Sequence, residues 1–258
     1  MLIDTHCHLD APEFDEDRDA VLARAWGQGM AAMVLPAVKR RNFAAVSSLC
    51  RQDSRCLPAY GIHPLYVDQA REEDLDVLKV QLQAGHAVAV GEIGLDYFVE
   101  PRQEERQKHF FVAQLKLARE FDLPVILHVR RAIDPILKEL RRFNVRGGIA
   151  HAFNGSFQQA ENFIKLGFAL GFGGAMTYEK ARHIRHLARE LPLESMVLET
   201  DAPDIPPEWR WKQRNEPAEL LDIANQLAEL RKLPLADVLA ITGNTALRVL
   251  PALTRVKS

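Results

Sequence analysis

Met1-Leu2-Ile3-Asp4-Thr5-His6-Cys7-His8 is a short apolar run that ends in two histidines separated by one residue. Leu2 and Ile3 predict the start of a β-strand. Because side chains alternate between the faces of a strand, we expect His6 and His8 to point one way and Cys7 the other, into packing. Two imidazoles on one face at the end of a buried strand form half of a metal site. Two hydrogen-bonded core histidines are the alternative that this stretch alone leaves open.

Apolar runs of this kind recur along the chain and alternate with stretches of helical character. They lie at residues 2–6, 31–37, 57–61, 87–92, 124–128, 147–151, 168–172 and 196–200. Helices are expected between and after them, at about 17–28, 42–52, 73–84, 103–121, 132–143, 156–165, 179–190, 216–230 and 235–249. This alternation predicts an α/β fold, a (β/α)8 TIM barrel that forms a single domain over residues 1–258. An open doubly wound sheet is the alternative, which the lack of G-x-G-x-x-G after the first run weakens.

Composition and charge restrict the classes of function. A net charge of −2 argues against a protein that grips long duplex DNA through a positively charged surface, so a polyanionic substrate would be held locally, by metal ions and a few arginines. No apolar run is long enough for a membrane span, and the N-terminus has no signal-sequence pattern. Three cysteines without a C-x-x-C favour a reducing cytoplasm, and we expect a monomer with no membrane partner.

Potential metal ligands stand at the ends of five of the predicted strands. In a barrel the carboxyl ends of the strands converge on one mouth, where barrel enzymes keep their sites. Four histidines and two carboxylates at that one end predict a metal site for Zn²⁺ or a similar ion. These residues are His6, His8, Glu92, His128, His151 and Asp201.

Six ligands exceed what one catalytic zinc normally takes from protein, and they suit two divalent ions, Zn²⁺, Mg²⁺ or Mn²⁺, that share a bridging group. Glu92 is the expected bridge, because a carboxylate can divide its two oxygens between ions. Two neighbouring ions can polarise one substrate oxygen and generate hydroxide at neutral pH. Asp201 has a second expected role, in which it orients the attacking water and accepts its proton.

Basic and aromatic residues follow the fifth and eighth predicted strands. A rim of such cations would suit a few phosphates, and the tryptophans in the same loop could stack on a base or simply pack the loop. Arg214 opens the run Arg214-Asn215-Glu216-Pro217, which is also consistent with an anchor for the loop. The rim residues are Arg130, Arg131, Arg210, Lys212 and Arg214, and the tryptophans are Trp209 and Trp211.

The residues that carry these expectations resemble a known family. The matching motifs are His6-Cys7-His8, Gly61-Ile62-His63-Pro64, Gly91-Glu92-Ile93-Gly94-Leu95-Asp96-Tyr97, His128, His151-Ala152-Phe153-Asn154-Gly155, Glu199-Thr200-Asp201 and Arg214-Asn215-Glu216-Pro217. In this order they resemble TatD-family metal-dependent hydrolases of the amidohydrolase superfamily, most closely the bacterial YjjV-like branch.

The resemblance implies deoxyribonuclease activity with two divalent ions. It places His6, His8, Glu92 and Asp201 on one ion and Glu92, His128 and His151 on the other. It also makes His63 a site residue that binds the substrate. We expect Arg130, Asn154 and Arg214 to bind the substrate as well, from the loops that follow the predicted strands. The chain departs from the family pattern after His128, His151 and Asp201, so the metal chemistry transfers more directly than the substrate.

Three functions follow from these patterns. The first is a phosphodiesterase or deoxyribonuclease that acts transiently on DNA ends or short nucleic acids through a metal-activated water. The second is a binuclear hydrolase of an amide, a cyclic amide or an aminoacyl ester, because the same hydroxide attacks these bonds. The third is a metal-binding protein without catalysis, against which Asp201 beside open metal positions argues.

Overall fold

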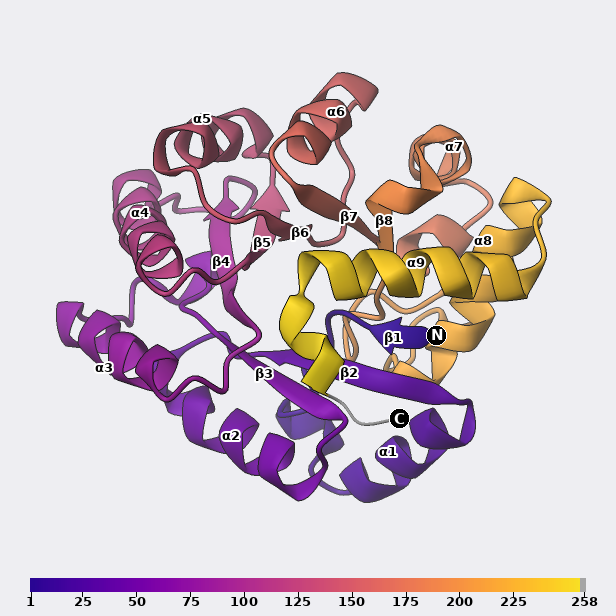
Figure 1. The fold of residues 1–258 in the computed structure, drawn as a ribbon, viewed down its shortest axis with the longest axis horizontal. Coiled ribbons are helices and arrows are strands. Elements are labelled where there is room, and N and C mark those ends of the chain that lie inside the picture. The colour runs from indigo at the N-terminus through magenta and orange to yellow at the C-terminus, as the bar shows by residue number, and fades with distance from the viewer. Residues whose placement is uncertain (256–258) are drawn as a thin grey trace.

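Eight parallel strands form a barrel in the computed structural model, which describes residues 1–255 (Figure 1). The strands are β1 (Leu2–Asp4), β2 (Met30–Pro36), β3 (Cys56–Tyr60), β4 (Ala89–Asp96), β5 (Val125–Arg130), β6 (Gly148–Ala150), β7 (Phe168–Phe172) and β8 (Met196–Leu198). They pair in sequence order, and Thr5 N–H donates to Leu198 O while Asp201 N–H donates to His6 O, which joins the two edges. The predicted TIM barrel is confirmed and the open sheet is wrong. Residues 256–258 of the expected single domain lie outside the described part.

Helices follow the strands and surround the barrel (Figure 1). They are α1 (Arg18–Gly27), α2 (Phe43–Gln52), α3 (Glu72–Gln83), α4 (Glu104–Glu120), α5 (Ile133–Phe143), α6 (Phe157–Lys165), α7 (Arg182–Glu190), α8 (Leu220–Arg231) and α9 (Leu235–Val249). Ser156 caps α6, because its hydroxyl accepts from Gln159 N–H while the Gln159 side chain accepts from Ser156 N–H. Within residues 1–255, no helix is both long and apolar enough to cross a bilayer.

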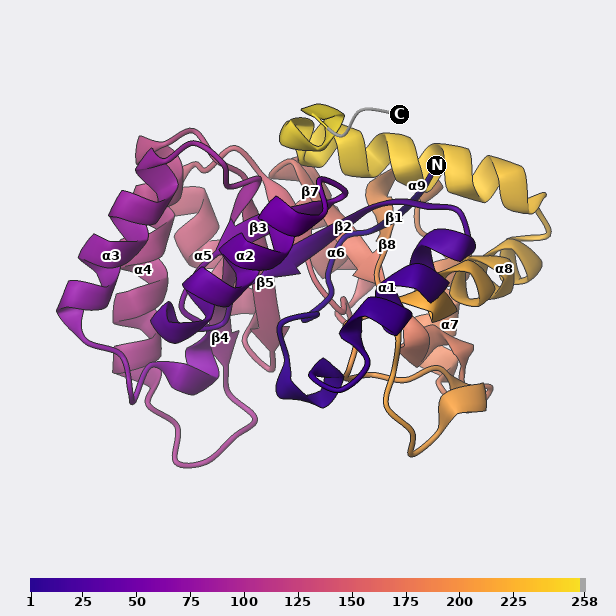
Figure 2. The ribbon, with the colours of Figure 1, turned by 90° about the horizontal axis from the view of Figure 1, so that it is seen from below.

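Two apolar layers hold the barrel together and leave one of its ends polar. The larger core lies between the strands and the surrounding helices. A smaller one fills the barrel interior with Ile3, Val34, Ile126 and similar side chains, and Ala246 and Val249 of α9 pack against it. Figure 2 shows α9 across the end of the barrel where the strands begin. The site must therefore form at the opposite end.

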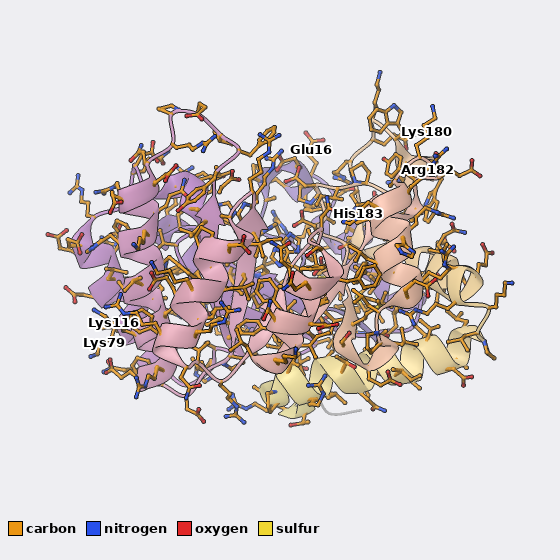
Figure 3. The ribbon with its side chains drawn as sticks, turned by 90° about the horizontal axis from the view of Figure 1, so that it is seen from above. Glu16, Lys79, Lys116, Lys180, Arg182 and His183 are labelled. Carbon is orange, nitrogen blue, oxygen red and sulfur yellow. The ribbon has the colours of Figure 1, made fainter. Side chains whose placement is uncertain are left out.

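The open end of the barrel is surrounded by the loops that follow the strands. Figure 2 shows two of them projecting furthest from α9: the loop between β4 and α4, and the loop between β8 and α8. Figure 3 shows Lys180 and Arg182 at this end of the molecule, whereas Lys79 and Lys116 lie toward the other. We call this open end the mouth.

Candidate metal centre

Four side chains, one on β4 and three in the segments just after β1 and β8, point ligand atoms at one another in the mouth. His6 Nε2 lies 3.1 Å from His8 Nε2, 3.3 Å from Glu92 Oε2 and 3.5 Å from Asp201 Oδ1. His8 Nε2 lies 3.5 Å from the same glutamate oxygen and 3.6 Å from the same aspartate oxygen. As the alternation along a strand predicts, His6 and His8 face the same way. We call these four atoms the cage.

The cage has the dimensions of a tetrahedral cation site. Bonds of about 2.0–2.1 Å around a zinc ion place neighbouring ligand atoms about 3.3 Å apart. The five cage distances above lie between 3.1 and 3.6 Å. The donor set of two imidazoles and two carboxylates is also one that Zn²⁺ accepts. The residues therefore fit a divalent ion.

Glu92 lies between the cage and a second group of histidines. Its Oε2 belongs to the cage, while its Oε1 lies 3.4 Å from His63 Nε2 and 3.0 Å from His128 Nδ1. Burial opposes ionisation of Glu92, but the surrounding imidazoles, with His63 and His6 foremost, hold the pKa of its carboxyl well below the usual range. We call Glu92 Oε1, His63 and His128 the outer group.

A carboxylate that sequence reasoning missed holds the far side of the outer group. Asp96 is buried at the end of β4, and its Oδ2 lies 2.9 Å from His128 Nε2, in hydrogen-bonding distance. His128 therefore presents Nδ1 to Glu92, and Nε2 to Asp96. Asp96 lies four residues after Glu92 on the same strand, so strand alternation places both on one face and is the signal that could have identified it.

His63 has its tautomer fixed by the backbone. Leu65 N–H donates to His63 Nδ1, 3.1 Å away. Burial lowers the pKa of His63 to about 4, so the ring is neutral at neutral pH. A neutral ring that accepts at Nδ1 carries its proton at Nε2, and His63 Nε2–H is therefore a donor, 3.4 Å from Glu92 Oε1.

His151, the residue after β6, lies beside the cage. Behind it lies a second carboxylate that sequence reasoning did not identify, that of Glu199. His151 Nε2 is 3.5 Å from Asp201 Oδ1, and its other ring nitrogen, Nδ1, is 3.0 Å from Glu199 Oε1. The His151 ring stacks on that of His6 with centroids 3.8 Å apart. Its placement on the second ion stays a prediction. Glu199 lies two residues before Asp201, the spacing that could have identified it.

The residues expected to meet substrate have different environments. Arg130 is exposed two residues after His128, its guanidinium lies 3.7 Å from the centre of the Phe98 ring, and no carboxylate within residues 1–255 pairs with it. Arg214 instead binds both oxygens of Asp17 at 2.7 Å and Glu216 at 3.0 Å. These contacts favour the anchoring role that the sequence left open for Arg214. Asn154 is exposed in the loop after β6.

Comparisons with known proteins agree with this architecture. The sequence matches the profile of the family described as TatD related DNase over residues 3–251. It is 42% identical to the uncharacterized metal-dependent hydrolase YjjV of Escherichia coli (strain K12). The alignment spans 247 residues and covers 94% of this chain and 95% of that protein. It is 31% identical to the deoxyribonuclease TATDN3 of Homo sapiens. This alignment spans 268 residues and covers 98% of this chain and 95% of that protein.

One of these relatives also has a solved structure. The crystal structure of YjjV, a TatD homolog from Escherichia coli K12, matches this fold with a TM-score of 0.93 at 40% identity, covering 97% of this chain and 98% of that one. The similarity spans nearly the whole chain and therefore includes every strand that carries a site residue.

Proposed function

Because the chain belongs to the TatD-related family of metal-dependent hydrolases, we propose that it is a phosphodiesterase that acts on DNA ends or short nucleic acids. The human relative named a deoxyribonuclease supports this choice of substrate. The single observation that carries the proposal is the guanidinium of Arg130, two residues beyond His128, which has no carboxylate partner among residues 1–255.

Arg130 is suited to a phosphate next to the bond that is cut. Side chains two residues apart on a strand share a face, so Arg130 projects on the same side as His128 at the mouth. It lies over the ring of Phe98, which is 44% exposed on the loop after β4. A cation and an exposed ring side by side can bind a phosphate and stack on the adjoining base. Trp211, 61% exposed in the loop after β8, offers a further stacking surface.

The residues of the centre divide the remaining tasks. His6, His8, Glu92 and Asp201 would hold one divalent ion, and Glu92 Oε1, His128 and His151 would take part in holding a second. When bound, such ions polarise the phosphoryl oxygen and supply a nucleophile at neutral pH. His63 Nε2–H, a neutral donor, can hydrogen-bond a phosphate oxygen. Asp201, whose pKa is lowered despite burial by the charge of His151, stays ionised and can accept a proton.

We further propose that the enzyme works as a monomer in the cytoplasm and binds its substrate transiently. The three cysteines, Cys7, Cys50 and Cys56, are all free thiols, which supports a reducing compartment.

The test compares substrates of different length and bond type. Metal-depleted protein is reloaded separately with Mg²⁺, Mn²⁺ and Zn²⁺ and assayed on a single-stranded oligonucleotide, a duplex, a minimal aryl phosphodiester and a cyclic amide. We expect turnover of the phosphodiesters in at least one metal. Turnover of the amide alone would overturn the proposal in favour of an amide hydrolase.

Arg130→Ala tests the observation that carries the proposal. A charge-assisted contact of about 1.5–3 kcal/mol corresponds to a loss of roughly tenfold or more in kcat/KM on the oligonucleotide. The minimal substrate does not reach Arg130 and should be cut at an unchanged rate. Arg214→Ala is the matched control: its anchor with Asp17 would be lost, so we expect lower thermal stability and no dependence on substrate length. An equal loss on both substrates in Arg130→Ala would remove Arg130 from substrate binding.

A further inference from the structure

Histidines that bind a metal through one ring nitrogen must have the other nitrogen protonated and, when buried, hydrogen-bonded. Two histidines of the centre meet this requirement with ordinary partners. His8 Nδ1 lies 3.1 Å from the carbonyl oxygen of Pro36, which can only accept, so His8 carries its proton at Nδ1 and directs a lone pair from Nε2 into the cage. Asp96 does the same for His128 from the opposite ring nitrogen.

His6 and His151 lack such a partner among the described residues. Both Nδ1 atoms are buried and make no hydrogen bond, although both Nε2 atoms face the cage carboxylates. The two rings are stacked with an angle of 20° between their planes. A buried ring N–H without an acceptor destabilises the fold, so two adjacent ones require an explanation.

Glu199 has the acceptor capacity that these two rings lack. It is 1% exposed, its Oε2 is buried without a partner, and its Oε1 accepts from Ala152 N–H at 2.6 Å. His151 Nδ1 lies 3.0 Å from that Oε1, without the alignment of a hydrogen bond. A ring nitrogen of His6, one of His151 and an oxygen of Glu199 lie within 4.8 Å of one another. The last torsion of a glutamate is soft, so a small rotation of the carboxylate costs little.

A glycine on the neighbouring strand leaves the space that the Glu199 carboxylate occupies. Gly171 on β7 faces Glu199, and a Cβ placed on Gly171 would clash with Glu199 Oε2. Any other residue at position 171 would therefore displace the carboxylate from its place behind the stacked rings.

We propose that Glu199 is a positioning residue that accepts the Nδ1 protons of both His6 and His151, and so commits both Nε2 lone pairs to the metal. One carboxylate satisfies both rings: Oε1 takes Ala152 N–H and His151 Nδ1–H, and Oε2 takes His6 Nδ1–H. The metal-binding roles of His6 and His151 belong to the proposed function, but the hydrogen bonds do not depend on the substrate. Such partners of metal ligands typically change metal affinity by about 10–100-fold.

Glu199→Gln tests this role directly. The amide keeps one acceptor oxygen and turns an NH₂ toward the other ring, which then has no acceptor. We expect zinc affinity, measured by competition with a chromophoric chelator, to fall about tenfold or more. In ¹⁵N-histidine NMR of the zinc-loaded protein, the downfield Nδ1–H signal of His6 or of His151 should move upfield. Asp4→Asn is the matched control, because the buried Asp4 carboxylate accepts from Thr200 and His6 backbone and touches no ring.

A second variant retains the charge and moves the carboxylate. Gly171→Ala should push Glu199 away and reproduce the loss of zinc affinity, which keeps the test decisive if Glu199→Gln does not fold. Unchanged affinity and unchanged Nδ1–H signals in either folded variant would overturn the role of Glu199. An equal loss of affinity in Asp4→Asn would do the same. If the wild-type protein binds no ion, the proposed function fails, whereas the tautomers of His6 and His151 in metal-free protein at alkaline pH still decide the role of Glu199.

Discussion

The cage and the outer group share Glu92 but differ in what their atoms do in the absence of a cation. In the cage, His6 and His8 turn Nε2 toward the carboxylate oxygens of Glu92 and Asp201. With Pro36 fixing one proton of His8 at Nδ1, its Nε2 faces these acceptors and binds either a second proton or, through its lone pair, a cation. In the outer group, His63 Nε2–H lies 3.4 Å from Glu92 Oε1, and His128 lies between Glu92 and Asp96.

This difference predicts two kinds of metal position. Acceptors that face one another in a buried space repel until a proton or a cation comes between them, so the cage favours an ion strongly. An ion at the outer group must displace the hydrogen bond that already exists between His128 and Glu92. We therefore expect a tightly bound ion in the cage and a weaker one beside His128.

Glu92→Gln should have the largest effect, because Glu92 is the only residue that belongs to both groups. Loss of several kcal/mol of transition-state stabilisation corresponds to roughly 10³-fold in kcat/KM. His63→Ala removes one neutral donor worth about 1 kcal/mol and should lose only about fivefold. The measurement is steady-state kinetics with elemental analysis of each variant. Near-wild-type turnover of Glu92→Gln with its metal retained would refute the bridging role.

His8→Ala and His128→Ala separate the two positions. Their side chains are matched in exposure, at 16% and 17%, and each has its second ring nitrogen held by one acceptor. Titration of metal-depleted wild-type protein should show two steps with affinities at least about tenfold apart. His8→Ala should lose the tighter step and His128→Ala the weaker one. Loss of the same step in both variants would mean that the cage and the outer group hold a single ion.

Most of the fold could be predicted because its signals are local. Each strand is a short apolar run, and each ligand of the centre ends one, so barrel topology alone brings His6 and Asp201 together from opposite ends of the chain. Where the first and the last strand meet, Asp201 N–H donates to His6 O and joins these two residues directly. Spacing along single strands was sufficient for this part of the site.

The remainder depends on contacts that no local pattern encodes. The pairing of Arg214 with Asp17 links residues far apart in the sequence, and only the packed loops show that this guanidinium is occupied. The tautomer of His63 likewise follows from one backbone N–H, that of Leu65. Asp96 and Glu199 belong to motifs of the family resemblance, but their roles depend on which histidine ring nitrogen each carboxylate contacts.

Alkaline pH should distinguish the cage from the outer group through the stability of the metal-free protein. We expect this effect to be smaller than those of the substitutions above. Burial opposes protonation of His8, but Glu92 and Asp201 outweigh it and raise the pKa of His8 to about 9. Burial lowers the pKa of His63 to about 4. A raised histidine pKa contributes stability that is complete below its unfolded value of about 6.5 and is lost as pH rises through the folded value. A lowered one contributes stability that is lost only toward acid.

The metal-free protein should therefore lose thermal stability as pH rises from about 6.5 to about 9, and His8→Ala should flatten part of that decline. His63→Ala should leave the alkaline side unchanged and flatten only the decline below about pH 6.5. The pKa values of His128 and His151 are also raised, despite burial, by their carboxylate neighbours, so some alkaline loss should persist in His8→Ala. The measurement is thermal unfolding of the wild type, His8→Ala and His63→Ala, each kept metal-free by a chelator, from below pH 6.5 to about pH 9. It gives the dependence of stability on pH for each of the three proteins. An alkaline decline in His8→Ala as steep as that of the wild type would show that the proton in the cage does not reside on His8, and the expected difference between the two metal positions would lose its electrostatic basis.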